Sequence, residues 1–378
     1  MKRAALLFCC LLPVLLSACG EGESDVTGQS ATALIPSLTW MEPEQLDAAT
    51  EFTFTRSEDG YTLVSIPDDG ASYLVIPKGQ AVPENLPDTV TPLCQPLSNV
   101  YLAASATMDM VVKLGALDAV AFSSLPAGDW TIPEAKAAME EGMIEYAGKY
   151  SAPDYERICS GDCPLAIENT MLYHSPEIRE QLERFGVPVL VDHASHEATP
   201  LGRMEWIKLY GVLFGKEAQA EAVYEAQAET IRDLEGTDAG KRAAFFYLSS
   251  NGEVKVRRPD DYIPQLIRMA GGEYVFDSLE ETSALSTVTL QWEDFYAQAR
   301  DADVLIYNST VTEVLPDLEA LTAKNPLLSD FAAVQSGEVY CTRENFYQAS
   351  MELGDLAGDL HRVLTGEKDD LTFLTHLE

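Results

Sequence analysis

The sequence predicts an α/β protein made of two similar lobes joined by a long helix, with a small β appendage at its N-terminal end. Three observations predict this fold class. Short apolar strands alternate with helical stretches from Ser98 onward. Segments of the first half recur in the same order in the second half, at an offset of roughly 150 residues. A long Ala/Glu-rich helical stretch lies between the two halves.

Composition and charge exclude several classes of protein. The chain has 378 residues, of which 46% are hydrophobic, enough to build real cores rather than a disordered chain. It carries 61 Asp and Glu against 25 Lys and Arg, a formal net charge of −36. Such a surface repels phosphate backbones and anionic lipid, so we expect no nucleic-acid partner and no direct adsorption to a membrane.

The N-terminus has the pattern of an export signal. Basic Lys2 and Arg3 precede a short apolar run, which ends in Leu16-Ser17-Ala18-Cys19. This ending resembles a bacterial lipobox, and the resemblance implies that Cys19 is acylated and becomes the first mature residue. We therefore expect a lipoprotein signal peptide over residues 1–18 and a flexible tether over 19–45. The protein would then be lipid-anchored on the extracytoplasmic face of the bacterial cell membrane.

Residues 46–90 are expected to form the β appendage. Two stretches that alternate polar and apolar residues flank Glu58-Asp59-Gly60, and Asp-Gly between such stretches is typical of a hairpin. Ser72–Ile76 is a further predicted strand. Pro83, Pro87 and Pro92 indicate a linker to the next domain.

The rest of the chain divides into an N-terminal lobe (91–198), linking helices (199–236) and a C-terminal lobe (237–378). Thr199-Pro200 is a good helix start, with Thr as the N-cap and Pro in the first turn. The second linking helix is expected over Lys216–Leu234, roughly 28 Å long, and would make a stiff hinge. The recurring segments of the two lobes are Met108–Gly115 with Ile263–Gly271, Pro164–Met171 with Asp303–Thr310, and Phe185–Val191 with Ser336–Cys341.

Four cysteines remain after removal of the signal peptide: Cys94, Cys159, Cys163 and Cys341. Outside the cytoplasm they are candidates for disulfide bonds. Cys159 and Cys163 could close a tight loop, which would leave Cys94 to pair with Cys341, but four cysteines allow three connectivities. A Cys₄ zinc site is the competing interpretation.

Motifs of common enzymes are missing from the sequence. It contains no G-x-S-x-G, no P-loop, no G-x-G-x-x-G and no H-E-x-x-H. His193 and His196 stand three residues apart beside Asp192 and Glu197, which leaves direct metal binding as an alternative. Histidines of a surface loop before the Thr199 cap are the simpler interpretation.

Several stretches resemble the substrate-binding lipoproteins of ABC transporters, in the class that binds ferric siderophores, haem or cobalamin (class III periplasmic binding proteins). They are Ala104–Met108 with Leu114–Val120, Tyr155–Ile158 with Pro164–Ile167, Gln181–Val189, and Ile267–Glu273. The resemblance covers about residues 95–365. It implies a monomeric, non-enzymatic receptor without a cofactor, which binds a small-molecule metal chelate between its lobes. An ABC permease and its ATPase subunits would be its partners.

The ligand is expected where the carboxyl ends of the strands of the two lobes face each other. A chelate needs flat apolar or aromatic walls and a few matched charges, and arginine binds carboxylate or phosphate oxygens in bidentate fashion. The candidate ligand-binding residues are Trp130, Tyr146, Lys149, Tyr150, Thr170, Tyr173, Arg257, Arg258, Asn308, Arg343, Phe346 and Tyr347.

Contacts with the permease are implied by the resemblance alone. In this family one glutamate on an outer helix of each lobe pairs with permease arginines. Glu177 is the match in the first lobe, and Glu313 or Glu319 in the second. Two alternative functions stay open: a Zn²⁺ or Mn²⁺ receptor of a metal importer, and an extracytoplasmic chelatase-like enzyme.

Overall fold

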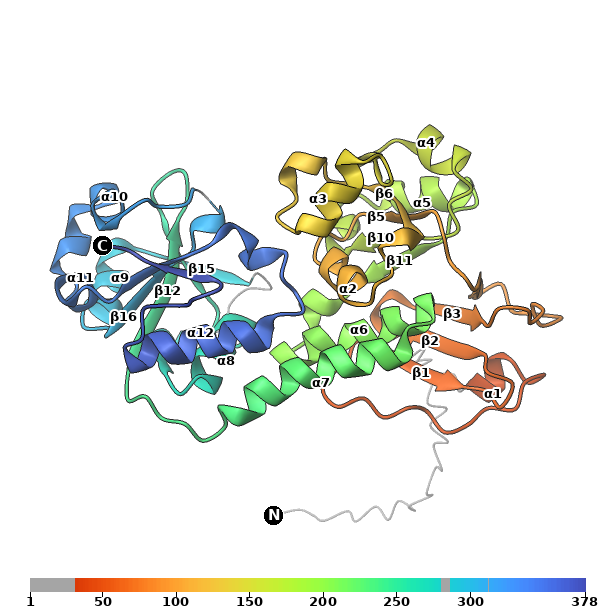
Figure 1. Ribbon diagram of the computed structural model, residues 1–378, viewed down its shortest axis with the longest axis horizontal. Helices are drawn as coiled ribbons and strands as arrows, with labels where there is room; N and C mark the ends of the chain where they lie inside the picture. Colours follow the sequence, from red (N-terminus) through yellow and green to blue (C-terminus); the bar gives the residue numbers. More distant parts are fainter. Residues whose placement is uncertain (1–30, 280–285, 312) are drawn as a thin grey trace, which may run out of the picture.

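The computed structural model describes residues 31–279, 286–311 and 313–378. These residues form an N-terminal β sheet and two α/β lobes, and two successive helices lie between the lobes in sequence (Figure 1). This is the predicted fold class. The predicted signal peptide and Cys19 lie outside the described residues.

The N-terminal sheet has four strands in the order β1-β2-β3-β4. They are β1 (Thr53–Arg56), β2 (Thr62–Ile66), β3 (Ala71–Ile76) and β4 (Val90–Cys94), and a short helix α1 (Ala31–Leu34) precedes them. β1 and β2 pair antiparallel, and Gly60 in their turn has φ +87°, so the predicted hairpin is confirmed. Pro92 lies within β4, which tolerates it because β4 is an edge strand. The sheet thus extends past residue 90, where the first lobe was expected to begin.

Two buried carboxylates of the first linking helix and the loop before it hold the N-terminal sheet on the molecule. Glu205 accepts the backbone N–H groups of residues 47–49 at 2.7–2.8 Å. Glu197 accepts those of Thr50 and Glu51 at 2.9–3.1 Å, together with the indole N–H of Trp206. The segment that leads into β1 is therefore fixed by charge-assisted hydrogen bonds.

The first lobe is built on a parallel sheet in the order β11-β10-β5-β6-β7. The strands are β5 (Val100–Leu102), β6 (Val120–Ser123), β7 (Glu145–Tyr146), β10 (Ala166–Asn169) and β11 (Val189–Asp192). A small hairpin of β8 (Gly148–Lys149) and β9 (Ala152–Pro153) follows β7. The helices are α2 (Thr107–Lys113), α3 (Pro133–Glu140), α4 (Tyr155–Ser160) and α5 (Pro176–Arg184).

The second lobe has a mixed sheet in the order β15-β13-β12-β16-β17-β18, with β14 beside β12. The strands are β12 (Arg242–Leu248), β13 (Val254–Arg257), β14 (Glu273–Tyr274), β15 (Thr287–Leu290), β16 (Val304–Tyr307), β17 (Val339–Thr342) and β18 (Leu374–His376). The helices are α8 (Tyr262–Met269), α9 (Trp292–Ala299), α10 (Leu318–Lys324), α11 (Ala332–Ser336) and α12 (Leu353–Thr365).

The internal repeat is confirmed by the topology. Three adjacent parallel strands of the first lobe, β11-β10-β5, correspond to β17-β16-β12 of the second. The lobes differ at their edges, because β13, β15 and β18 of the second lobe run antiparallel to their neighbours.

The linking segment consists of α6 (Pro200–Phe214) and α7 (Glu217–Asp233), separated by Gly215 at φ +65°. The hydroxyl of Thr199 accepts the N–H of Gly202 at 3.0 Å, so the predicted cap is confirmed. Most of α6 is buried, whereas α7 packs between α6 and α12 of the second lobe (Figure 1). Among the described helices, none has both the length and the apolar character needed to cross a bilayer.

The four described cysteines are free thiols, which corrects the predicted disulfides. Cys94 is exposed in the N-terminal sheet, whereas Cys341 is buried in β17 at the centre of the second lobe, so these two cannot meet. Cys159 and Cys163 flank a turn without bonding. Burial raises the pKa of the Cys163 thiol to about 11, so this thiol stays protonated at neutral pH.

Candidate functional site

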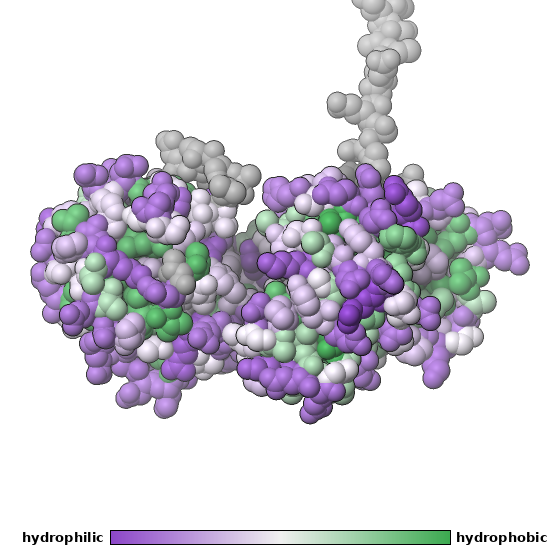
Figure 2. Space-filling view, turned by 90° about the horizontal axis from the view of Figure 1, so that it is seen from above, coloured by the Kyte–Doolittle hydropathy of each residue, from purple (hydrophilic) through white to green (hydrophobic). Residues whose placement is uncertain are grey.

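A cavity of about 650 Å³ lies between the two lobes. Figure 2 shows the lobes side by side, with hydrophilic residues over both and a recess at their boundary. The cavity size is within the range of small-molecule sites. Its walls come from both lobes and from the start of α6, as a site between two half-sites requires.

The first-lobe wall is formed by the segments that follow β5, β10 and β11, at the carboxyl ends of parallel strands. Asp192 is the charged residue at the end of β11. Its carboxylate accepts hydrogen bonds from the Thr107 hydroxyl at 2.6 Å, the Tyr210 hydroxyl at 2.5 Å and the Ala194 N–H at 2.8 Å. These three hydrogen bonds fix the orientation of the Asp192 carboxylate in the wall.

Arg257 at the end of β13 dominates the second-lobe wall. Its side chain is buried, Nη2 donates to the Tyr347 hydroxyl at 2.7 Å, and Asp261 lies 3.5 Å from Nη1. Burial by itself lowers the pKa of Arg257, but Asp261 and Tyr347 outweigh it and the pKa is raised overall. The guanidinium is therefore a permanent positive charge at the cavity wall.

Tyr347 is poised as a hydrogen-bond donor to the cavity. Its hydroxyl oxygen accepts from Arg257 and also from Nδ2 of Asn308 at 2.6 Å. A phenol has one proton and two lone pairs, so the proton remains for a third partner. The ring is 40% exposed, which leaves that proton accessible to a bound molecule.

Arg203 adds a second guanidinium to the lining, from the first turn of α6. It lies over the ring of Tyr262, 4.3 Å from the ring centroid, and Nη2 donates to the Ser195 carbonyl at 2.7 Å. Burial lowers its pKa, and the positive charge of Arg257 acts in the same direction. The repulsion between the two cations would be relieved by an anion between them.

Both arginines keep an unused buried donor. Nε of Arg203 and Nε of Arg257 have no hydrogen-bond partner among the described residues, and neither is accessible to bulk water. A buried N–H without an acceptor costs about 1–3 kcal/mol.

Apolar side chains supply much of the remaining lining. They include Met110 from α2, Met171 after β10, and Phe346 and Leu353 of the second lobe. The arrangement combines an apolar surface with a few convergent positive and donor groups, which suits a bulky molecule with acidic substituents.

A second cavity, of about 450 Å³, lies between β3 and α5 at the seam of the N-terminal sheet and the first lobe. Its one lining cation, Arg179, already forms two hydrogen bonds to Asp69, at 2.6 and 3.0 Å. The positive charge of Arg179 is thus already balanced, so we place the candidate site in the cavity between the lobes, which has two arginines in its lining.

Four of the residues selected from the sequence line the inter-lobe cavity: Thr170, Arg257, Phe346 and Tyr347. Asn308 is fully buried and acts through Tyr347. The structure thus brings together one of the four selected cations and two of the selected aromatic residues.

The other selected residues lie outside this lining, each for a local reason. Trp130 is buried in the core, and the Arg258 guanidinium forms an ion pair with Asp260. Arg343 donates from Nε to the Leu374 carbonyl. Tyr173 turns away from the cavity toward Asp69 of the N-terminal sheet. The remaining three belong to β7 and the β8–β9 hairpin, at the edge of the first sheet remote from β10 and β11: Tyr146, Lys149 and Tyr150.

Sequence reasoning missed Arg203, Asp261 and Tyr262, all of which line the cavity. Arg203 carries no distinguishing signal in the sequence, because Glu205 and Lys208 are also charged residues of the largely apolar helix that follows Thr199. Asp261 caps α8 by accepting the N–H of Ile263, an ordinary role that carries no ligand signal.

The three glutamates assigned to the permease are exposed. Glu177 lies in the first turn of α5 after β10, and Glu319 in the first turn of α10 after β16, so they occupy equivalent places in the two lobes. Glu313 forms an ion pair with Lys324 at 2.7 Å.

Comparisons with known proteins agree with this architecture. The family described as "periplasmic binding protein" matches residues 102–346. An uncharacterized lipoprotein of Methanocaldococcus jannaschii is 24% identical over 317 residues, which cover 79% of this chain and 74% of the relative.

Solved structures share the fold at low identity. A periplasmic binding protein from Veillonella parvula aligns with a TM-score of 0.59 and 18% identity, covering 72% of this chain and 93% of that one. The periplasmic haem-binding protein HutB of Vibrio cholerae aligns with a TM-score of 0.57 and 16% identity, and the alignment covers 70% of this chain and 99% of HutB. The catecholate-siderophore-binding protein VctP of Vibrio cholerae aligns with a TM-score of 0.57 and 16% identity, and the alignment covers 71% of this chain and 94% of VctP.

Proposed function

The chain belongs to the periplasmic binding protein family, and we propose that it is the receptor of an ABC importer that binds an anionic metal chelate between its lobes. The chelate classes are an iron–siderophore, haem or a corrinoid. The family is typically non-enzymatic, so the chain is a binding protein, and the chelatase-like alternative loses its support.

The observation that carries the proposal is the pair of guanidinium groups, those of Arg203 and Arg257, in the lining of one cavity. Arg203 and Arg257 reach the cavity from α6 and from the second lobe, and the Tyr347 hydroxyl offers a further proton. Asp261 pairs with Arg257 at 3.5 Å, but the cavity lining holds a second guanidinium, that of Arg203. The oxygen atoms of an acidic ligand would accept charge-assisted hydrogen bonds from both arginines.

The apolar part of the lining and the cavity volume support a chelate over a small inorganic anion. A phosphate or sulfate would leave the exposed side chains of Met171 and Tyr347 uncovered inside a cavity of about 650 Å³. A porphyrin, corrin or aromatic catecholate would cover them. Two structures with the same fold bind such molecules by name, a haem and a catecholate siderophore.

Calorimetric titration of the purified chain with haemin, a ferric catecholate and cyanocobalamin tests the proposal. We expect at least one of these probes to bind, and Arg257→Ala to weaken that binding about 10- to 100-fold, because a hydrogen bond to a charged group contributes about 1.5–3 kcal/mol. Arg184→Ala is the matched control, since Arg184 is exposed on α5 and remote from the lining. Unchanged affinity in both Arg203→Ala and Arg257→Ala would exclude an anionic chelate in this cavity.

Delivery to the permease and attachment to the membrane complete the proposed function. Acylation of Cys19 would hold the protein at the extracytoplasmic surface, and relatives described as lipoproteins support this. Glu177 and Glu319 are our candidates for contacts with the permease, because both are exposed at equivalent helix starts. Glu313 is the weaker candidate, since Lys324 already neutralises it.

A receptor for bare Zn²⁺ or Mn²⁺ is the other candidate function, and one group of possible metal ligands favours it: Glu51, His193 and His196. However, this group takes no ligand from the second lobe. An ion bound there would not be enclosed by both lobes, so we treat the group as a separate site.

A further inference from the structure

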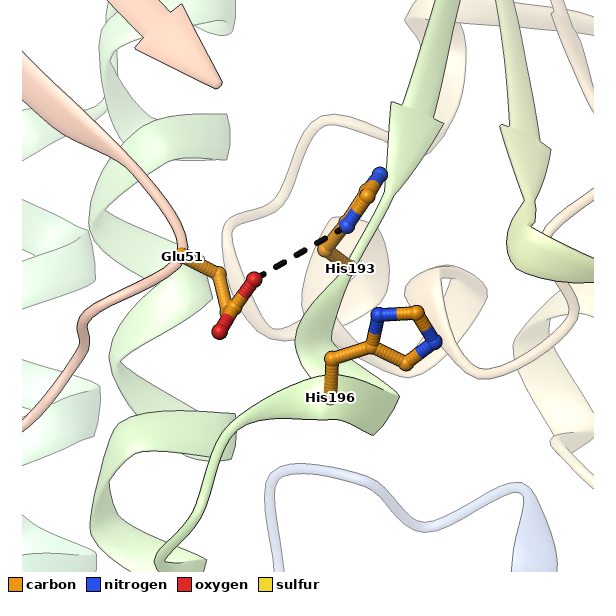
Figure 3. Close-up of side chains that lie close together, drawn as sticks. All are labelled: Glu51, His193 and His196. Atoms are coloured by element: carbon orange, nitrogen blue, oxygen red, sulfur yellow. Dashed lines mark ion pairs between the residues drawn. The ribbon is translucent and has the colours of Figure 1, made fainter. Parts of the chain in front are cut away.

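Three potential metal ligands converge where the N-terminal sheet meets the first lobe. Glu51 precedes β1, His193 directly follows β11, and His196 ends the short helical turn after it. One ligand atom from each side chain lies within 4.8 Å of the other two. Figure 3 shows the carboxylate of Glu51 facing the ring of His193, with His196 beside them.

Hydrogen bonding sets the protonation of the His193 ring. The Tyr173 hydroxyl donates to Oδ1 of Asp69 at 3.1 Å, and Nε2 of His193 is 2.6 Å from the same hydroxyl oxygen. A hydroxyl has one proton and a carboxylate only accepts, so Tyr173 gives its proton to Asp69. Nε2 of His193 is therefore the protonated nitrogen, and Nδ1 carries a free lone pair. Metal-ligating histidines typically donate their second ring N–H to an acceptor that a carboxylate supports, and here Tyr173 and Asp69 form that chain.

No hydrogen-bond donor among the described residues reaches the lone pair of His193 Nδ1. His193 is 1% exposed, and its Nδ1 has no hydrogen-bond partner among the described residues. The nearest charged atom is Oε2 of Glu51 at 3.9 Å, which is itself an acceptor. Two acceptors that face each other across this distance in a buried place leave room for a cation between them.

The third ligand and the surroundings fit the same interpretation. The N–H of Glu51 is held by the Glu197 carboxylate at 3.0 Å, so the backbone of this ligand is fixed. His196 is exposed and can turn toward the other two.

We propose that Glu51, His193 and His196 bind one divalent transition-metal ion of the Zn²⁺ class and so tie the N-terminal sheet to the first lobe. Two imidazoles and one carboxylate are a ligand set that suits zinc, and they leave a fourth position open to water. His196 also lines the inter-lobe cavity, whereas Glu51 and His193 do not, so zinc binding that depends on His193 and Glu51 tests this site apart from the proposed receptor function.

Titration of the EDTA-treated full mature chain with ZnCl₂ tests the site. We expect one Zn²⁺ per chain by calorimetry and by elemental analysis after dialysis. His193→Ala should weaken the affinity at least 100-fold, and Glu51→Gln at least 10-fold. Zinc should raise the midpoint of thermal unfolding of the wild type and leave that of His193→Ala unchanged, because the ion would bind only the folded seam.

Two variants act as controls. His174→Ala removes an exposed first-lobe histidine outside the cluster and should bind zinc like the wild type. Arg257→Ala should also bind zinc normally; loss of zinc there would place the ion between the lobes and overturn the proposal. Failure of the wild type to bind zinc stoichiometrically at micromolar concentration would overturn it as well. If the His193→Ala variant does not fold, the Glu51→Gln variant tests the site instead, because the Glu51 side chain is partly exposed. Zinc affinity equal to that of the wild type in Glu51→Gln would contradict the site.

Discussion

Two buried glutamates show how differently the same residue type is used in this molecule. Glu205 on α6 is fully buried and satisfied, since it accepts three backbone N–H groups and pairs with Lys208 at 3.1 Å. Glu168 on β10 is equally buried, but neither of its carboxyl oxygens has a hydrogen-bond partner among the described residues. Burial raises the pKa of Glu168 to about 8, so its carboxyl is largely protonated at neutral pH.

This difference predicts a pH dependence of stability. The folded pKa of Glu168 is raised above its unfolded value of 4.5, so its contribution is fully present below that pH and is lost as the pH rises through about 8. Glu168→Gln should remove this dependence. We expect the free energy of unfolding of the wild type to fall relative to the variant by up to about 1.4 kcal/mol per pH unit within that window.

Denaturant titrations at several pH values measure the effect. Glu180→Gln is the control, because Glu180 is exposed on α5. Parallel pH profiles of the wild type and Glu168→Gln would contradict the assigned protonation of Glu168.

At the scale of elements, close helix contacts connect the linking helices to each other and to the second lobe. A Cβ at Gly354 on α12 would lie 2.5 Å from the backbone carbonyl oxygen of Gln227 on α7. The Gln227 side chain also accepts the N–H groups of Gly354 and Asp355, at 3.0 and 3.2 Å. Between α6 and α7, a Cβ at Gly211 would lie 2.6 Å from Cβ of Ala220. The linking helices are thus packed too closely to α12 and to each other for easy sliding.

Two glycines of the same helix test this contact. Gly354→Ala should lower the free energy of unfolding by about 1–3 kcal/mol, because the added methyl group meets backbone that must move. Gly358→Ala should raise it by up to about 1 kcal/mol, since its Cβ meets nothing within 4 Å and alanine favours a helix. Chemical denaturation of both variants measures the difference. Equal effects would mean that α7 and α12 are not held at this distance.

At the scale of the whole molecule, one loop of the second lobe holds the first lobe. Residues 348–352 lie between the short helix after β17 and α12, and they contact the first lobe repeatedly. Gln348 exchanges hydrogen bonds with Thr131 and Asp129, Met351 donates its N–H to Asp109, and Glu352 pairs with Lys113 at 2.5 Å. Together with α7, these contacts favour modest closure around a ligand over a wide hinge motion.

The proposed delivery to a permease requires a docking surface on the first lobe, and Glu177 is our candidate for it. We expect Glu177→Arg to reduce uptake of the bound chelate at least 10-fold while leaving its affinity for the purified protein unchanged, because Glu177 is exposed and remote from the cavity lining. Glu180→Arg, one turn further along α5, carries the same charge change and should transport normally. Uptake measured in cells that carry the transporter, beside calorimetry, separates the two effects. Normal uptake with Glu177→Arg would place the docking surface elsewhere.

The sequence alone determined what depends on local order along the chain. Alternating strands and helices, the Asp59-Gly60 hairpin, the Thr199 cap and the recurring segments each rest on short-range periodicity or turn chemistry, and together they predicted two similar lobes with a β appendage. Part of the site followed by the same logic, because Thr170, Arg257, Phe346 and Tyr347 come directly after strands and line the cavity.

Only the tertiary structure decided which side chains meet. Arg203 and Arg257 line one cavity because α6 contacts both α2 of the first lobe and α8 of the second. Glu51 reaches His193 because Glu197 and Glu205 hold residues 47–51 against the first lobe. Tyr146 and Arg343 also follow or end predicted strands, yet strand order and hydrogen bonds carry them away from the cavity. These contacts join residues far apart in the sequence, and a periodic pattern holds no information about such pairs until the lobes have packed.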